Sequence, residues 1–240
     1  MTFDFHATTL EDKRAELIEI IRGQLIVSCQ AADGHALRDT HAMTKIARAC
    51  VDGGAPAIRC GGYGGVEDIS SIAQECNVPV FGLTKEGDTG VYITPTKESV
   101  KAVIAAGAAV VCADATSRPR PDGSTFADLV EVAHTEGSLI MADCATPEDI
   151  ANAHEAGADL LSTTLAGYTP DREKTTGPDF DCLREGRTLV GEDAFLIGEG
   201  RFHTPADVAH GRLAGADAII AGTAITDPGF ITAQFASLLR

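Results

Sequence analysis

Short apolar runs recur along the chain, and longer segments that mix polar and apolar positions separate them. An apolar run bounded by glycine, proline or a polar residue is typical of a buried strand, whereas apolar residues three or four positions apart are typical of a helix. The sequence also predicts a helix over residues 10–21, a helix after each strand, and a last helix over residues 222–239. The eight predicted strands cover residues 25–29, 55–58, 80–85, 109–113, 138–142, 159–162, 194–198 and 218–221.

Eight strands that alternate with helices in a chain of 240 residues indicate a closed parallel barrel rather than an open doubly wound sheet. We therefore expect an α/β fold of the (β/α)8 TIM-barrel class, with residues 1–240 forming a single domain. Residues 1–22 are expected to add an amphipathic helix that caps one end of the barrel.

A repeated glycine step supports the barrel. A glycine that closes a helix ahead of an apolar strand recurs before every second predicted strand. A repeat of two strands fits a barrel interior that is filled by layers from alternate strands. The alternative is that this step is only a favourable turn sequence. The four glycines are Gly53, Gly107, Gly157 and Gly215.

Composition limits the classes of partner. The chain has 19 basic and 35 acidic residues, so its formal charge is −16, which argues against nucleic acid or an anionic membrane surface as a partner. No apolar run approaches membrane-spanning length, and the first residues lack the pattern of a secretory signal. Seven cysteines, without a Cys-x-x-Cys pair, favour free thiols in a reducing cytoplasm. We interpret the seven histidines as surface or helix residues and expect no metal site.

Polar residues end the predicted strands. In a parallel barrel these ends meet at one mouth, where the active site lies. It costs free energy to bring these groups together unless they bond to one another or to a ligand. They comprise one amide, two cations, three carboxylates, a hydroxyl and a glycine. The mouth is therefore the predicted site, although any one of these residues could be a solvated strand end. They are Gln30, Arg59, Lys85, Asp114, Asp143, Thr164, Glu199 and Gly222.

Lys85 has two chemical interpretations. As a base it must be neutral part of the time, and as a nucleophile it would form a Schiff base with a carbonyl substrate. Partial burial beside Arg59 would lower its pKa, whereas nearby carboxylates would raise it. Glu199 is a candidate second acid or base, or a partner for sugar hydroxyls. Asp143 could orient Lys85, bind substrate or cap the helix that follows Pro147.

Two glycine turns indicate a phosphate-binding type of barrel. Gly200 follows the seventh predicted strand, and Gly222 and Thr223 follow the eighth, where barrels commonly bind phosphate through main-chain amides. Arg201 adjoins the first turn, and we expect it to clamp the anion. No P-loop or catalytic serine elbow is present.

Several segments together resemble the N-acylglucosamine-6-phosphate (N-acetylmannosamine-6-phosphate) 2-epimerase family of bacterial sialic-acid catabolism. Two of them, Arg-Pro-Arg-Pro-Asp-Gly at 118–123 and Ser-Thr-Thr-Leu-Ala-Gly-Tyr-Thr at 162–169, are quite specific. The matching segments follow one another in order along the chain, and the resemblance covers nearly its whole length. The matching segments are 25–31, 57–59, 92–96, 113–123, 141–143, 161–169 and 198–201.

The resemblance implies a phosphate-binding barrel that inverts carbon 2 of an N-acylated hexosamine 6-phosphate without a cofactor. It implies that Lys85 removes the proton beside the open-chain aldehyde and that Glu199 assists at the reacting hydroxyl or returns a proton. By the same resemblance the sugar and its enolate would contact Gln30, Arg59 and Asp143, and the phosphate would contact Gly200, Arg201, Gly222 and Thr223. Thr164, at the end of the sixth predicted strand, is expected to bind substrate at the same mouth.

The chain departs from the family's pattern in three places. Asp227 stands where the family usually has arginine, and a carboxylate there would repel phosphate. Residues 86–88 are less basic than in the family, and the glycine-rich loop 61–65 is longer. Two alternatives to the epimerase therefore stay open: a lyase that uses Lys85 in a Schiff base, and a non-catalytic barrel that binds a sugar phosphate. The oligomeric state is also open, with a homodimer among the alternatives.

Overall fold

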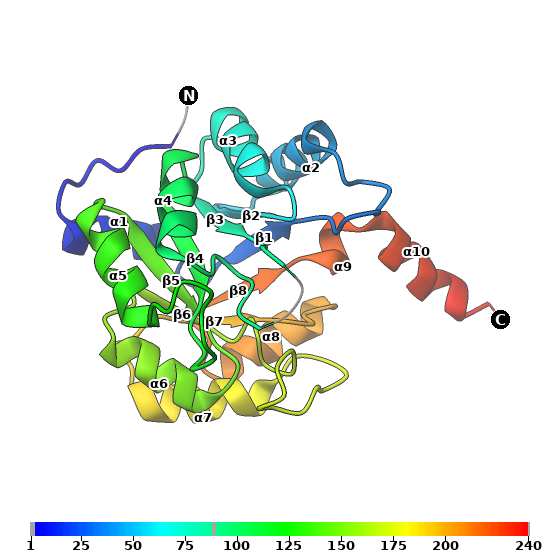
Figure 1. Ribbon diagram of the computed structural model, residues 1–240. Coiled ribbons are helices and arrows are strands. Elements are labelled where there is room, and N and C mark those ends of the chain that lie inside the picture. The colour runs from blue at the N-terminus through cyan, green and yellow to red at the C-terminus, as the bar shows by residue number, and fades with distance from the viewer. Residues whose placement is uncertain (1–2, 88–89, 240) are drawn as a thin grey trace.

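The computed structural model describes residues 3–87 and 90–239 (Figure 1). Residues 1–2 of the predicted N-terminal segment, 88–89 of the loop after Lys85, and 240 lie outside the described residues. No helix in the described part of the chain is both long and apolar enough to cross a membrane.

Eight parallel strands pair in chain order and close into a barrel, which confirms the predicted fold class. The ring closes between the first and last strands, where Val27 pairs with Ala221. The strands are β1 (Leu25–Cys29), β2 (Ile58–Gly62), β3 (Val80–Thr84), β4 (Val110–Asp114), β5 (Leu139–Asp143), β6 (Leu160–Ser162), β7 (Leu196–Glu199) and β8 (Ala218–Ala221).

Helices surround the barrel (Figure 1). Threonines begin several of them, and at α5, α6 and α8 an aspartate three residues later completes a capping box that satisfies free amides of the first turn. The helices are α1 (Leu10–Ile21), α2 (Thr40–Asp52), α3 (Gly65–Glu75), α4 (Lys97–Ala105), α5 (Phe126–Thr135), α6 (Pro147–Glu155), α7 (Phe180–Val190), α8 (Pro205–Leu213), α9 (Thr223–Thr226) and α10 (Pro228–Ser237).

Alternation along the strands divides the core into two apolar clusters. In β3, Phe81 and Leu83 belong to the inner cluster, whereas Val80 belongs to the outer cluster between strands and helices. Leu17 and Ile21 of α1 belong to the inner cluster as well, so this helix packs against the barrel interior. The same alternation directs polar residues near the strand ends into the mouth.

The structure corrects two predicted elements. The second strand begins at Ile58 rather than at residue 55, so Arg59 is its second residue and not its end. Pro56 cannot donate to a ladder, and Gly61 and Gly62, predicted as a loop, pair instead with Leu83 and Thr84. Among the other strands, β1 and β8 have the predicted bounds, and the rest differ from the prediction by one or two residues.

The last predicted helix is divided in two. Asp227 has an extended backbone between α9 and α10, and its carboxylate accepts a hydrogen bond of 3.1 Å from the amide of Phe230. With Pro228 at the first helical position, Asp227 caps a new helix instead of continuing the old one. In Figure 1, α10 projects away from the barrel.

Candidate active site

A cavity of about 320 Å³ opens at the carboxyl ends of the strands. Lys85, which follows β3, and Glu199, which ends β7, both line it. Gln30, Thr164 and Gly222 line the same cavity after β1, β6 and β8. The amine and the carboxylate that the sequence nominates for catalysis therefore share one cavity.

A buried ion network lies beside the cavity. Arg59 is 1% exposed and makes a two-pronged contact with Asp143, at 2.7 Å from Nη2 and 3.0 Å from Nη1. Nη1 of Arg59 also donates to Glu199, and the hydroxyl of Thr164 donates to both carboxylates. Neither Arg59 nor Asp143 lines the cavity, so the contacts observed here give them the role of holding Glu199. Their direct contact with substrate stays a prediction.

Lys85 is in a setting that favours the neutral amine. Burial lowers its pKa, and the positive charge of Arg59 lowers it further, while Glu199 and Asp143 act in the opposite direction. The net direction of the pKa shift is downward, which the sequence alone left open. Among the described residues, Lys85 forms no ion pair with a carboxylate.

The two carboxyl groups of the network hold protons more readily than usual. Burial raises the pKa of Glu199, and Arg59 only partly offsets it. Burial also raises the pKa of Asp143, which is fully buried, against the opposing charge of Arg59. Arg59 itself stays charged, because Asp143 and Glu199 outweigh the effect of burial and raise its pKa. The lowered pKa of the lysine and the raised pKa of the glutamate bring their proton affinities closer together, which favours general acid–base catalysis by the pair.

Gln30 presents an unused acceptor. Its amide nitrogen donates to the hydroxyl of Ser28 at 2.9 Å, but its buried Oε1 has no hydrogen-bond partner among the described residues. A buried acceptor without a partner costs free energy unless a ligand or water satisfies it. Gln30 is therefore placed to accept a bond from a substrate hydroxyl or amide.

The predicted phosphate residues also gather at this cavity. Gly200, Arg201, Gly222 and Thr223 all line it. Within the described part of the chain, the amides of Gly200, Arg201 and Gly222 donate no hydrogen bond. Unpaired main-chain amides beside a cavity are suited to an oxyanion.

The guanidinium of Arg201 has other partners. Its nitrogens donate to the carbonyl oxygens of Gly177 and Ala166 and to the hydroxyl of Thr175, at 2.7, 2.8 and 2.9 Å. These residues belong to the loop between β6 and α7, and Tyr168 of the same loop lies under the guanidinium, 5.0 Å from the ring centroid. The side chain thus braces this loop, so an anion clamp through the guanidinium stays a prediction without a contact to support it.

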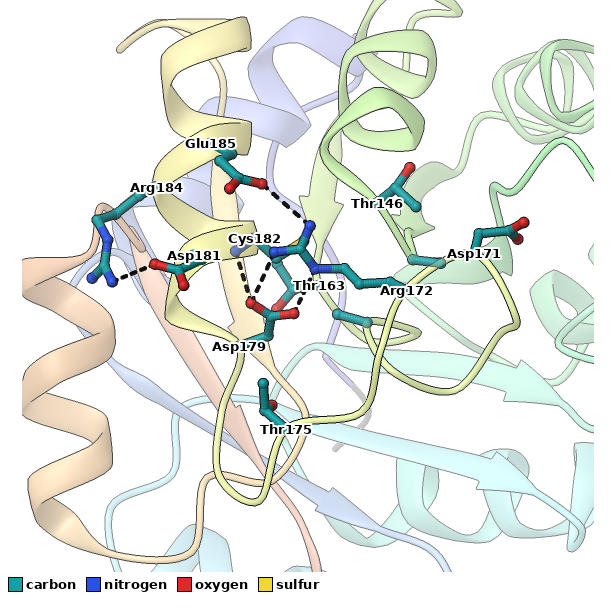
Figure 2. A network of polar contacts seen from close by, with 12 residues as sticks. Thr146, Thr163, Asp171, Arg172, Thr175, Asp179, Asp181, Cys182, Arg184 and Glu185 are labelled. Carbon is teal, nitrogen blue, oxygen red and sulfur yellow. Dashed lines mark hydrogen bonds and ion pairs between the residues drawn. The ribbon is translucent and has the colours of Figure 1, made fainter.

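A second arginine holds the far end of the same loop (Figure 2). Arg172 makes a two-pronged contact with Asp179, at 2.5 and 3.1 Å, and reaches Glu185 at 3.2 Å. Asp179 also accepts from the amide of Cys182 and so caps α7. The loop that carries Tyr168 to the cavity is therefore fastened at both ends.

Asp227 does not line the cavity. Its carboxylate caps α10 and lies 3.5 Å from Nε2 of His35. We therefore expect Asp227 to repel a phosphate in the cavity less strongly than the sequence indicated.

For three polar residues the structure differs from an expectation or removes one alternative. Asp114 does not line the cavity but binds Arg118, at 2.6 Å, and Thr116. The helix after Pro147 is capped by Thr146, so Asp143 is not its cap. His203, interpreted as a surface or helix residue, lines the cavity. Across residues 3–87 and 90–239, no group of three or more His, Cys, Asp or Glu side chains is arranged to hold a metal ion.

Two aromatic residues of the site were not predicted from the sequence. Tyr63, in the glycine-rich loop after β2, and Tyr168 both line the cavity and are about half exposed. The only sequence signal for Tyr63 is its position between two pairs of glycines. Tyr168 lies in a segment that carried the family resemblance, which did not assign it a role.

Known proteins resemble this chain over most of its length. The model of the family described as "Putative N-acetylmannosamine-6-phosphate epimerase" matches residues 43–240. A relative from Corynebacterium glutamicum (strain R), described as a 2-epimerase of that kind, is 74% identical over 96% of this chain and 99% of its own. A relative from Cutibacterium acnes with the same description is 44% identical over 93% and 97%.

A solved structure of an epimerase of the same description is also similar to this chain. The N-acetylmannosamine-6-phosphate 2-epimerase from Clostridium perfringens matches with a TM-score of 0.88 and 34% identity, covering 99% of both chains. A thiamine phosphate pyrophosphorylase from Pyrococcus furiosus, at a TM-score of 0.61 and 16% identity, shares the fold alone.

Fold and cavity together define a (β/α)8-barrel protein with a lysine and a glutamate at its mouth. The chain belongs to the N-acetylmannosamine-6-phosphate epimerase family, a family of isomerases.

Proposed function

We propose that this chain converts N-acetylmannosamine 6-phosphate to N-acetylglucosamine 6-phosphate by moving a proton at carbon 2 of the open-chain sugar. The observation that carries the proposal is that Lys85 and Glu199 line one cavity, with opposite pKa shifts. The activity for which the family and its relatives are named supports the choice of substrate.

Each residue has a defined part in this mechanism. Neutral Lys85 removes the proton next to the aldehyde, and negative charge develops on the aldehyde oxygen as an enolate forms. Inversion requires that a proton returns to the opposite face of carbon 2, and Glu199 lies on β7 rather than beside β3, so it is placed to act from another direction. Arg59 and Thr164 hold the Glu199 carboxylate in position. No cofactor is needed for this proton transfer.

The phosphate would lie against the main chain of residues 200–201 and 222–223. The support is that these residues line the cavity, with unpaired amides at Gly200, Arg201 and Gly222 in the described part of the chain. Because the whole chain has a formal charge of −16, the anion must be captured locally rather than by long-range attraction.

Turnover of the phosphorylated and unphosphorylated manno sugars tests the proposal. We expect proton NMR to show conversion of the 6-phosphate to its gluco epimer and little conversion of the free sugar. Asp227→Asn should leave KM for the 6-phosphate within about twofold, because the carboxylate caps α10 and lies outside the cavity. Binding of the 6-phosphate without turnover would contradict the epimerase.

The lowered pKa of Lys85 also suits a Schiff-base lyase. Borohydride reduction in the presence of the 6-phosphate distinguishes the two reactions. For the epimerase we expect the mass of the Lys85 peptide to stay unchanged, whereas a stable adduct on that peptide would favour the lyase.

We further propose a homodimer in which two copies exchange α10. No residue of α10 is buried within the chain, and Phe235 is 72% exposed. A groove of about 600 Å³, lined by Leu25, Val27, Ile46 and Ile225, lies over β1 and α2, where the helix after the eighth strand of a barrel ordinarily packs. The exposed helix α10 of one copy therefore fits the apolar groove of a second copy, and the reverse contact follows by symmetry.

Sedimentation measures this assembly. The full chain should sediment as a dimer, and a chain that ends at Asp227 should sediment as a monomer. A monomeric full chain at micromolar concentration would rule the exchange out.

A cytoplasmic location also stays a prediction. Its support is that all seven cysteines are free thiols, six of them buried. Free thiols persist in reducing compartments.

A further inference from the structure

Close main-chain packing fixes the glycine-rich loop after β2. A β-carbon at Gly61 would lie 2.0 Å from the carbonyl oxygen of Leu83, and one at Gly62 would lie 2.4 Å from Oε1 of Gln30. Both glycines also have positive φ, at 102° and 63°. Only glycine therefore fits at positions 61 and 62, which come immediately before Tyr63.

The other end of the loop is held by a buried carboxylate. A β-carbon at Gly64 would lie 2.0 Å from the carboxylate of Asp68, which is fully buried. Asp68 accepts two hydrogen bonds from Arg38, at 2.9 and 3.1 Å, and one from Thr40, at 2.6 Å. Tyr63 thus stands between closely packed glycines, Gly62 on one side and Gly64 on the other, rather than on a free loop.

The loop brings Tyr63 to Lys85. The amide of Lys85 donates to the carbonyl oxygen of Gly62 at 3.0 Å, which joins the two main chains. Nζ of Lys85 lies over the ring of Tyr63, 5.2 Å from its centroid. A cation at this distance from an aromatic face is attracted by the negative charge of the face.

We propose that Tyr63 is a positioning residue for Lys85, whose ring face holds the amine and stabilises the ammonium ion that forms when Lys85 takes up the substrate proton. This inference rests on the proposed epimerisation for its role in catalysis. It does not need the hydroxyl of Tyr63, because the attraction comes from the ring.

The expected effect has a definite sign. The aromatic face favours the charged form of Lys85 and so raises its pKa, against the lowering by burial and Arg59. Leucine at position 63 keeps an apolar cover but removes the aromatic face. Tyr63→Leu should therefore lower the pKa of Lys85 by about half a unit, and should lower the plateau of kcat/KM by about two- to threefold.

The pH profile separates this role from a structural one. In Tyr63→Leu the acid limb of kcat/KM should move to lower pH, whereas in Tyr63→Phe the limb should stay at its wild-type position. A loss of structure alone would lower the plateau and leave the limb in place. Tyr63→Met, which is also apolar without a ring, should behave as Tyr63→Leu does and guards against a folding defect in one variant.

A second readout does not depend on turnover. Lysines labelled by reductive methylation with carbon-13 can be titrated by NMR, and Lys85→Met assigns the Lys85 signal. We expect a lower pKa for Lys85 in the leucine and methionine variants than in the wild type and the phenylalanine variant. Equal values in all four proteins would overturn the role of Tyr63. A shift in a protein that does not epimerise the sugar would contradict only the proposed function.

Discussion

Lys85→Met should lower kcat for epimerisation by about a thousandfold or more, because general acid–base catalysis contributes a factor of roughly 10²–10⁴ and Lys85 is the proposed base. Methionine fills a similar volume, so the circular dichroism spectrum should match that of the wild type. Lys101→Met is the matched control, since Lys101 is half exposed on α4. Both rates are measured by proton NMR at saturating sugar phosphate.

The control variant should keep wild-type activity. A Lys85→Met protein that is folded and retains a tenth or more of the wild-type kcat would show that another group removes the proton. The amine of Lys85 would then be only a neighbour of the reacting atoms.

Arg59→Met should reduce the free energy of unfolding by about 3–5 kcal/mol, the typical cost of removing one partner from a buried ion pair. Arg59 is 1% exposed and serves two carboxylates, Asp143 and Glu199, which would be left without a cation. Arg184→Met is the control, because Arg184 pairs with Asp181 at an exposed site and should contribute little. Urea unfolding followed by circular dichroism measures both variants.

The pH dependence of that loss gives a further check. Without Arg59, the two buried carboxyl groups hold protons more tightly in the folded chain than in the unfolded one. The folded variant then binds more protons, so its stability relative to the wild type should fall as the pH rises from about 5 to about 8. A loss that is the same at both pH values would show that cavity formation, not unpaired charge, is the cause.

Periodicity and turn residues were sufficient to predict the barrel. The positions of Lys85 and Glu199 could also be predicted, because a polar residue that ends an apolar run of a parallel barrel lies at the mouth. Arg59 reaches the ion network in a different way. It is the second residue of β2 and points inward by strand alternation, and its long side chain spans the remaining distance.

The features that sequence reasoning missed depend on side-chain contacts that the hydrophobic pattern does not encode. Asp114 ends β4 like a mouth residue, but Arg118 binds it, and no local pattern indicates that pairing. Asp227 continues an apparently helical segment, yet its side chain caps a new helix. Tyr63 comes to the cavity only because glycines on both sides allow close packing against β3 and Asp68.

The most direct test of the mechanism is turnover of N-acetylmannosamine 6-phosphate in deuterium oxide, followed by proton NMR of the product. Because the proton removed by Lys85 exchanges with solvent, we expect N-acetylglucosamine 6-phosphate with deuterium at carbon 2. Product that forms with hydrogen retained at carbon 2 would contradict proton transfer through this cavity.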